Sequence, residues 1–246
     1  DQVRVFSTSR RLAVQVEVLP ERQADRSEEM TGPPVRVAVA EDGGQTPAGE
    51  GFARKVGLPF ADIGRIETDK GEYQSATVVH EGRATADILA DMIPAVVSAL
   101  RFPKMMRWGD GSNQFVRPVH GVVALLDDEV VPVTLFGVES GRSTVGHRVL
   151  LPESFAVAHA ADYAGALAER SVSIDQASRR REIEGLAEKL ACAAGSRVHP
   201  DPGLMAEHVE LVEWPGLLAG SFDDRYLELP AEVVVTTLRY HQKCLI

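Results

Sequence analysis

The chain has 246 residues, of which 44% are hydrophobic and 25% are charged. These proportions are typical of a folded protein and exclude a wholly disordered chain. Aspartate and glutamate number 36 against 26 lysines and arginines, so the formal net charge is −10 at pH 7. Attraction to nucleic-acid phosphate needs positive potential, so this charge balance excludes a protein that coats nucleic acid irrespective of sequence. Any nucleic-acid contact must then be made by a local basic patch.

The two cysteines, Cys192 and Cys244, form neither a CxxC pair nor a disulfide framework. No apolar run approaches the roughly 18 residues of a membrane-spanning helix, and the N-terminus lacks a signal segment. We therefore expect a cytoplasmic location and no contact with a membrane. The chain begins with Asp1 rather than methionine, and an expected helix runs to its last residue, so we expect a piece truncated at both ends.

Alternating apolar and polar residues in the first half predict two half-buried strands, over residues 3–6 and 12–19. Polar residues 20–31 and the Gly-Pro-Pro after them predict a loop, because proline cannot donate a hydrogen bond to a strand ladder. Beyond this loop the sequence predicts a weak strand over residues 35–40, a helix over residues 46–56 ending at Gly57, a strand over residues 72–80 and an amphipathic helix over residues 85–100.

In the second half, β-branched runs predict strands over residues 119–126 and 130–136, joined by an acidic turn. The sequence also predicts an extended segment over residues 149–157, helices over residues 162–170, 175–194 and 201–212, a short strand over residues 217–222 and a last helix from Pro230 to the end.

Strands and helices do not alternate regularly along the chain, so we predict an α+β fold with mixed or antiparallel sheets and packed helices. We divide it into residues 1–157, an α+β body with basic loops, and residues 158–246, a mainly helical part with a short strand.

Motifs for catalysis are missing from the sequence. It contains no P-loop, no GxGxxG after a strand, no HExxH, and no GxSxG elbow. Each of the seven histidines stands alone and is expected to be a hydrogen-bonded surface or core residue rather than a metal ligand. The three arginines at 179–181 begin a glutamate-rich helix and predict a solvated, salt-bridged face. We therefore predict no catalytic residue and no metal ligand in this chain.

Basic side chains gather in the loops of residues 101–148 and again near the C-terminus. Arginine gives charged, two-pronged hydrogen bonds to phosphate, and the glycines beside it allow close approach of backbone N–H groups. The alternative is that these side chains anchor loops by pairing with aspartate and glutamate. The candidates for tRNA binding or subunit contact are Arg101, Lys104, Arg107, Trp108, Arg117, Arg142, His147, Arg148, Arg239 and Lys243.

Short stretches spread over nearly the whole chain, in order, resemble the β subunit of the bacterial heterotetrameric glycyl-tRNA synthetase. They are RRLAV (10–14), GPP (32–34), GFARK (51–55), KGEY (70–73), PKMMRWG (103–109), FVRPVH (115–120), SGR (140–142), GHR (146–148), VEWP (212–215) and LPAEV (229–233), which leads to HQK (241–243). The chain departs from the family at Cys244 and Leu245, where two aromatic residues are usual.

The resemblance implies that this is an N-terminal portion of a longer β subunit, in an assembly of two α and two β chains that charges glycine tRNA. In such enzymes the α subunit resembles the class II catalytic core and uses ATP with Mg, while β supplies tRNA contacts and assembly surfaces. No cofactor is then bound by this chain. Two alternatives stay open, namely a purely structural module that docks α, and an editing-type hydrolytic domain.

Overall fold

The computed structural model describes residues 3–40 and 43–246. It confirms the α+β class. The chain forms two compact units: unit 1 comprises Asp1–Leu19 and Leu89–Ile246, and unit 2 comprises Pro20–Ile88. Unit 2 is therefore inserted within the sequence of unit 1. The division predicted at residue 157 is a different one, lies inside unit 1, and stays a prediction.

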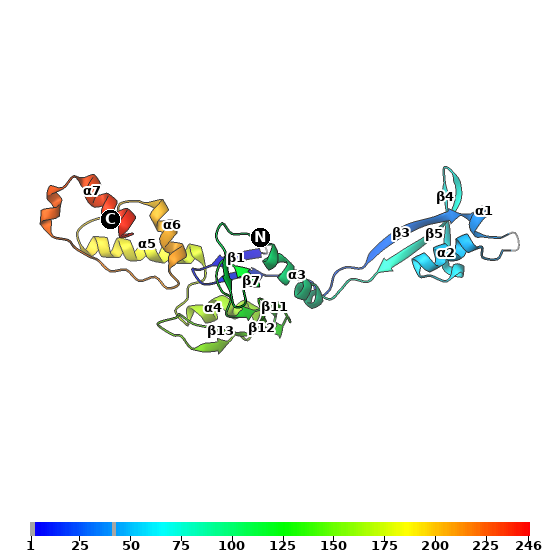
Figure 1. Ribbon diagram of the computed structural model, residues 1–246, viewed down its shortest axis with the longest axis horizontal. Helices are drawn as coiled ribbons and strands as arrows, with labels where there is room; N and C mark the ends of the chain where they lie inside the picture. Colours follow the sequence, from blue (N-terminus) through cyan, green and yellow to red (C-terminus); the bar gives the residue numbers. More distant parts are fainter. Residues whose placement is uncertain (1–2, 41–42) are drawn as a thin grey trace. The chain divides into compact units, whose positions relative to one another are not determined.

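Unit 2 is built on an antiparallel sheet of three strands in the order β3 (Arg26–Pro34), β5 (Gly71–His80) and β4 (Gly64–Thr68). Figure 1 shows β3 and β5 side by side with α2 (Pro47–Val56) near one end. Buried Phe52 and Val56 of α2 pack on Ala76 of β5. A side chain at Gly32 would begin 2.6 Å from the Phe52 ring, so only glycine fits against this helix.

The loop predicted over residues 20–34 is wrong from residue 26 onward, because β3 occupies it. Its two prolines lie at the end of an edge strand, where the pairing with β5 shifts register between Thr31 and Pro34, so a regular ladder of hydrogen bonds is not needed there. The strand predicted over residues 35–40 is also wrong, since Val35–Ala38 forms a helical turn, α1. The α2 prediction is confirmed: Thr46 caps the helix by accepting from the Gly49 N–H, and Gly57 ends it with φ 71°.

Unit 1 begins with an antiparallel hairpin, β1 (Val3–Ser7) and β2 (Leu12–Val16), as predicted. Helix α3 (Thr85–Ala99) begins in the last residues of unit 2 and continues into unit 1 from Leu89. It carries Pro94 inside it and confirms the predicted amphipathic helix. Its residues Leu89, Ala90 and Ile93 pack against buried Ala124, Val131 and Val133.

Short strands follow α3 in place of the two longer ones predicted. β6 (Met106–Trp108) pairs with β7 (Asn113–Phe115), and β9 (Leu125–Leu126) pairs with β10 (Glu129–Val130) across the predicted acidic turn. β12 (Val138–Gly141) lies between antiparallel β11 (Thr134–Leu135) and parallel β8 (Val122–Val123), and β13 (Ser143–Val145) pairs with β14 (Ser154–Ala156). The basic loops connect these small sheets.

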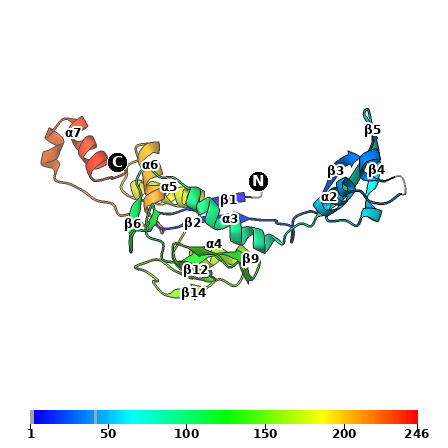
Figure 2. The same cartoon turned by 45° about the vertical axis from the view of Figure 1, so that its right-hand side comes forward.

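The C-terminal part of unit 1 is helical. It contains η2 (Ala160–Asp162), α4 (Tyr163–Ala168), α5 (Gln176–Ala193), α6 (Pro202–Leu211), η3 (Asp224–Glu228), α7 (Ala231–Thr236) and the π-helical turn η4 (Thr237–His241). Helices α5 and α6 lie side by side in Figures 1 and 2, joined by Ile183, Met205 and Val209.

Two C-terminal predictions are wrong. Residues 217–222 form no strand, because this exposed stretch has no partner strand in the part of the chain that is described; Leu218 is 98% exposed. The last helix ends at His241 instead of running to the end, and Lys243 then takes the left-handed conformation.

Among the described residues, no helix is long and apolar enough to cross a membrane.

Candidate nucleic-acid interface

The β6–β7 hairpin forms the centre of the predicted basic region. Gly109 and Gly111 turn the chain with φ of 64° and 86°, a conformation that favours glycine. Between them, Asp110 accepts hydrogen bonds from the Ser112 hydroxyl and backbone N–H, and these bonds lower the pKa of its carboxyl. Arg107 donates to the Gly111 carbonyl at 3.1 Å, which closes the turn. The tip of the hairpin is thus held by its own side chains.

Two aromatic rings of this hairpin pack with two rings from neighbouring segments. The Trp108 ring meets Phe136 edge-on, with ring centroids 5.4 Å apart, and Phe115 lies 5.3 Å from the same Phe136. Phe102 completes the group at 5.2 Å from Phe115. Trp108 is only half-buried, so packing fixes the ring while part of it stays open to solvent.

Three basic side chains of the candidate set are exposed and unpaired. Within residues 3–40 and 43–246, Lys104, Arg117 and Arg148 make no hydrogen bond or ion pair. The register that pairs Met106 with Phe115 brings Lys104 and Arg117, two residues further out on each side, to the same end of the hairpin. Their donors are free for an anionic partner.

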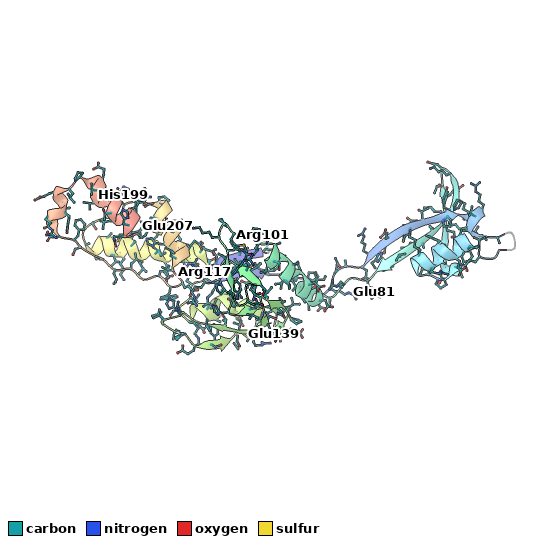
Figure 3. All side chains as sticks on the ribbon, viewed as in Figure 1. Glu81, Arg101, Arg117, Glu139, His199 and Glu207 are labelled. Atoms are coloured by element: carbon teal, nitrogen blue, oxygen red, sulfur yellow. The ribbon has the colours of Figure 1, made fainter. Side chains whose placement is uncertain are left out.

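Arg101 lies just after α3 and donates to the Ser98 and Leu100 carbonyls, at 2.6 and 3.0 Å. These are orphan acceptors at a helix C-terminus, where a cation is favourable. Figure 3 labels Arg101 and Arg117 in this part of unit 1. Arg101 is exposed, so its remaining N–H groups face water.

Arg142 and His147 are engaged within the fold. The Arg142 guanidinium donates to the Asp128 carbonyl at 2.7 Å and to the Ala158 carbonyl at 3.1 Å, which ties two loops together. His147 Nδ1 accepts from the N–H groups of Val149 and Leu150, at 3.3 and 3.1 Å. These contacts match the loop-anchoring alternative, although the partners are backbone carbonyl and N–H groups rather than carboxylates.

Arg239 and Lys243 are paired with acidic residues of α6 and its cap. Arg239 holds Asp201 with two nitrogens, and this pairing lowers the pKa of the Asp201 carboxyl far below its usual range. Asp201 also caps α6 by accepting from the Leu204 N–H at 3.0 Å. The Lys243 ammonium lies 2.7 Å from a Glu207 carboxylate oxygen. The two C-terminal candidates therefore fasten the last turn to α6.

A buried junction in unit 1 was missed by the sequence analysis. Arg11 lies in the turn between β1 and β2, and its Nε donates to Glu213 Oε1 at 3.0 Å. The Thr8 hydroxyl donates to the same carboxylate oxygen at 2.8 Å. The other Arg11 nitrogens donate to Thr144 and to the carbonyls of Val145 and Gly146. Burial raises the pKa of neighbouring Tyr163, which the positive charge of Arg11 partly offsets.

Arg179 is completely buried, which corrects the prediction that residues 179–181 form a solvated face. Its guanidinium donates to four backbone carbonyls, at 2.6–2.9 Å, from Ser7, Ser173, Ile174 and Val209. Burial lowers its pKa, while the acidic residues around it act in the opposite sense. The sequence did carry a signal, because Arg179 stands four residues before Ile183 and eight before Ala187, on the buried face of α5.

Among the described residues, no group of three His, Cys, Asp or Glu side chains is placed to hold a metal ion. A shallow hollow of about 400 Å³ in unit 2 is lined by Arg26, Glu28, His80 and Glu81, which mix both signs of charge.

The sequence profile of a family described as "Glycyl-tRNA synthetase beta subunit" matches residues 1–246. The chain belongs to this family. It is 39% identical over 243 residues to the "Glycine--tRNA ligase beta subunit" of Syntrophotalea carbinolica, which covers 99% of this chain and 35% of the relative. The subunits of the same description from Moorella thermoacetica and Chromohalobacter salexigens are 41% and 42% identical over 98% and 97% of this chain.

The chain spans about a third of the length of these relatives. Membership in the family confirms the resemblance found in the sequence. The structure also explains several of the family stretches by bringing them together: GPP meets GFARK through Gly32 and Phe52, and RRLAV meets VEWP through Arg11 and Glu213.

Proposed function

We propose that this chain is an N-terminal region of a glycine–tRNA ligase β subunit and that it contributes a contact with glycine tRNA. The contact surface is formed by the exposed, unpaired side chains of Lys104, Arg117 and Arg148, with Arg101 and Arg107 beside them in sequence. The observation that carries the proposal is that the side chains of Lys104, Arg117 and Arg148 pair with no described residue, in a chain with ten more acidic than basic residues. Backbone phosphates supply the opposite charge.

The proposal assigns chemistry and recognition to different chains. The α subunit of an α2β2 assembly would hold the catalytic site, with ATP and Mg, and would form the glycyl adenylate. This chain would bind no cofactor and supply no catalytic residue. In support, the most buried ion pair among the described side chains, Arg11 with Glu213, is held by hydrogen bonds with Thr8 and Thr144 of the fold.

A second candidate function is docking of the α subunit without contact to tRNA. It is favoured by the internal engagement of Arg142, His147, Arg239 and Lys243, which leaves fewer free cations than the sequence suggested. Co-elution of this chain with separately purified α subunit on gel filtration, with and without glycine tRNA, separates the two. A complex that forms without tRNA supports docking by this region, and one that requires tRNA supports the RNA contact.

The RNA contact is tested with a triple variant, Lys104→Ala, Arg117→Ala and Arg148→Ala. Each lost phosphate contact lowers the slope of log affinity against log salt by about 0.7–0.9, so the triple variant should lose about 2 units of slope and more than about tenfold in affinity near 0.1 M salt. Fluorescence anisotropy with labelled glycine tRNA measures both. The matched control replaces Arg36, Lys55 and Lys70 of unit 2, whose side chains are exposed and pair with no residue that the structure describes, and it removes the same charge.

An equal loss in the two triple variants would reject a local contact and indicate only general charge. Unchanged binding in the first variant, shown to be folded, would reject the tRNA contact at these residues. Release of glycine or another amino acid from mischarged tRNA by this chain alone would instead support the editing alternative.

A further inference from the structure

One face of the first hairpin of unit 1 carries five aliphatic side chains, with Ser7 at its end. In the antiparallel register, Val3 lies opposite Val16, Val5 opposite Val14, and Ser7 opposite Leu12. Residues directly opposite each other in a sheet point to the same side, and alternate residues along each strand share that side. Five aliphatic side chains therefore form a single patch, the hairpin face, which consists of Val3, Val5, Leu12, Val14 and Val16.

The hairpin face is uncovered although the hairpin itself is firmly held. Its members are 37–62% exposed, whereas Phe6, which points to the other side of β1, is 4% exposed and packs on Leu167, Val172 and Ile174. Hydrogen bonds also hold the same hairpin: Arg11 in its turn donates to Glu213, and Arg179 donates to the Ser7 carbonyl at the end of β1. One side of the sheet thus contributes Phe6 and Ala13 to a core, and the opposite side has aliphatic residues without a second layer.

The strand edges are also open. In the part of the chain that the structure describes, β1 and β2 pair only with each other, so the outward backbone groups of each strand meet no third strand, although the Ser7 carbonyl accepts from Arg179. Neither strand carries proline or lysine, which commonly protect a free edge, and Arg4 is the charged residue on the two strands. An aliphatic face and two open edges on the same two strands are what remains when part of a domain layer is taken away.

The composition of the hairpin face indicates what covers it. Interfaces between separate proteins are enriched in Tyr, Trp, Met and Arg at their centres. The hairpin face contains only valine and leucine, as in the interior of a domain. The relatives matched by this chain are about three times its length, so a longer β subunit has ample chain to supply the cover.

We infer that the hairpin face is a half-core, covered in the β subunit by a further segment of the same polypeptide that lies outside residues 1–246. That segment is apolar on the side that meets the hairpin and provides the second layer of the domain. The inference goes beyond the proposed tRNA contact and does not depend on it, because it concerns a different surface of unit 1.

Cysteine labelling tests the inference. Val14→Cys is placed in a background where exposed Cys192 and Cys244 are replaced by serine, both in the 246-residue chain and in a full-length β subunit that carries this sequence. A maleimide should modify the introduced thiol rapidly in the short chain and at least about 100-fold more slowly in the full-length subunit, because a covered site reacts only when it opens. Val149→Cys, at a loop position that is 77% exposed, is the matched control and should react equally in both.

The other outcomes each overturn the inference. Protection of the thiol at position 14 already in the 246-residue chain would mean that unit 2 or a second copy covers the face, and dilution would distinguish these. Protection of the full-length subunit only after α is added would make the face a subunit interface. Rapid reaction of the same thiol in the full-length subunit, with or without α, would show that the face remains open.

A thermal measurement gives an independent reading. Val14→Asp should leave the melting temperature of the 246-residue chain within about 1 °C and should lower that of the full-length subunit by more than about 5 °C, because only there is a charge forced into a core. Val149→Asp should leave both unchanged. Equal small effects of the two substitutions in the full-length subunit would contradict a covered face.

Discussion

Two groups of basic residues in unit 1 differ in what surrounds their donors. At the junction, Arg11 and Arg179 point inward and find one carboxylate and several backbone carbonyls. Around the β6–β7 hairpin, Lys104 and Arg117 face solvent and meet no acceptor in the described chain. The comparison teaches that residue type alone does not distinguish a basic residue that holds a fold from one available to a ligand.

The largest expected effect tests the inward group. Arg179→Met should lower the free energy of unfolding by about 3–5 kcal/mol, because it removes the donors of four carbonyls in a completely buried place. Urea unfolding measures the loss. Arg180→Met is the control one residue away: its only ion pair is exposed, to Glu184 at 3.7 Å, and its loss should cost under about 0.5 kcal/mol. Equal midpoints for the two variants would contradict the assigned role.

The next effect concerns the carboxylate of the junction. Glu213→Gln should cost about 2–3 kcal/mol, since the nearly buried Arg11 then keeps its charge without a counter-charge. In a double-mutant cycle with Arg11→Met, urea unfolding should give a coupling energy above about 1 kcal/mol. Additive losses would mean that the pair contributes no specific interaction and that Thr8 and the carbonyls hold the junction.

A smaller, pH-dependent effect is expected at the start of α5. Burial acts to raise the pKa of Asp175, but hydrogen bonds from Ser178 outweigh it, and the net pKa is lowered. A carboxyl with a depressed folded pKa contributes stability above its unfolded value of about 3.9, and this stability is lost as the pH falls through the folded pKa.

Asp175→Ala should therefore cost about 1 kcal/mol at pH 7, and the difference from the unsubstituted chain should shrink below about pH 4. Urea midpoints at pH 7 and pH 3 check this. Asp175→Asn keeps an acceptor for the Ser178 N–H, which is 2.6 Å away, so its cost should be smaller and independent of pH. A loss for Asp175→Ala that is equally large at pH 3 would assign the effect to packing.

The smallest expected effect completes the comparison. Lys104→Ala, Arg117→Ala and Arg148→Ala should each change the free energy of unfolding by less than about 0.5 kcal/mol, because no bond within the described fold is lost. The same urea measurements detect any larger change. A cost above about 1 kcal/mol for any of them would move that residue to the fold-holding group.

The sequence predicted the structure correctly where the decisive contacts lie within a single helix. The cap at Thr46, the left-handed Gly57 and the apolar stripe of α3 each lie within one element, and all three were predicted. β3 was missed because its first residues, Arg26–Glu29, are all polar and exposed, so the sequence shows no alternation of apolar and polar residues. It is a strand because it pairs with β5. The failed strand at residues 217–222 is the reverse case, an apolar run without a partner.

The candidate residues could be named from the sequence, but their surroundings could not. Whether Arg142 or Lys104 is free depends on carbonyls placed by other loops, such as those of Asp128 and Ala158. Arg179 looked solvated because its neighbours Arg180 and Arg181 are, and its acceptors include Ser7, which is 172 residues away. Sequence patterns carry periodicity and caps, and they carry no record of such distant pairings.

The insertion of unit 2 has a consequence for synthesis on the ribosome. The first hairpin emerges early, but the residues that secure it are Arg179 and Glu213, the latter 205 positions after Thr8. At roughly 5–20 residues per second, the hairpin waits about 10–40 s for them. Pro20–Ile88 is continuous in sequence, so it can complete its sheet during that interval. Unit 2 can therefore finish folding before unit 1 does, while the aliphatic face of the hairpin stays exposed on the nascent chain.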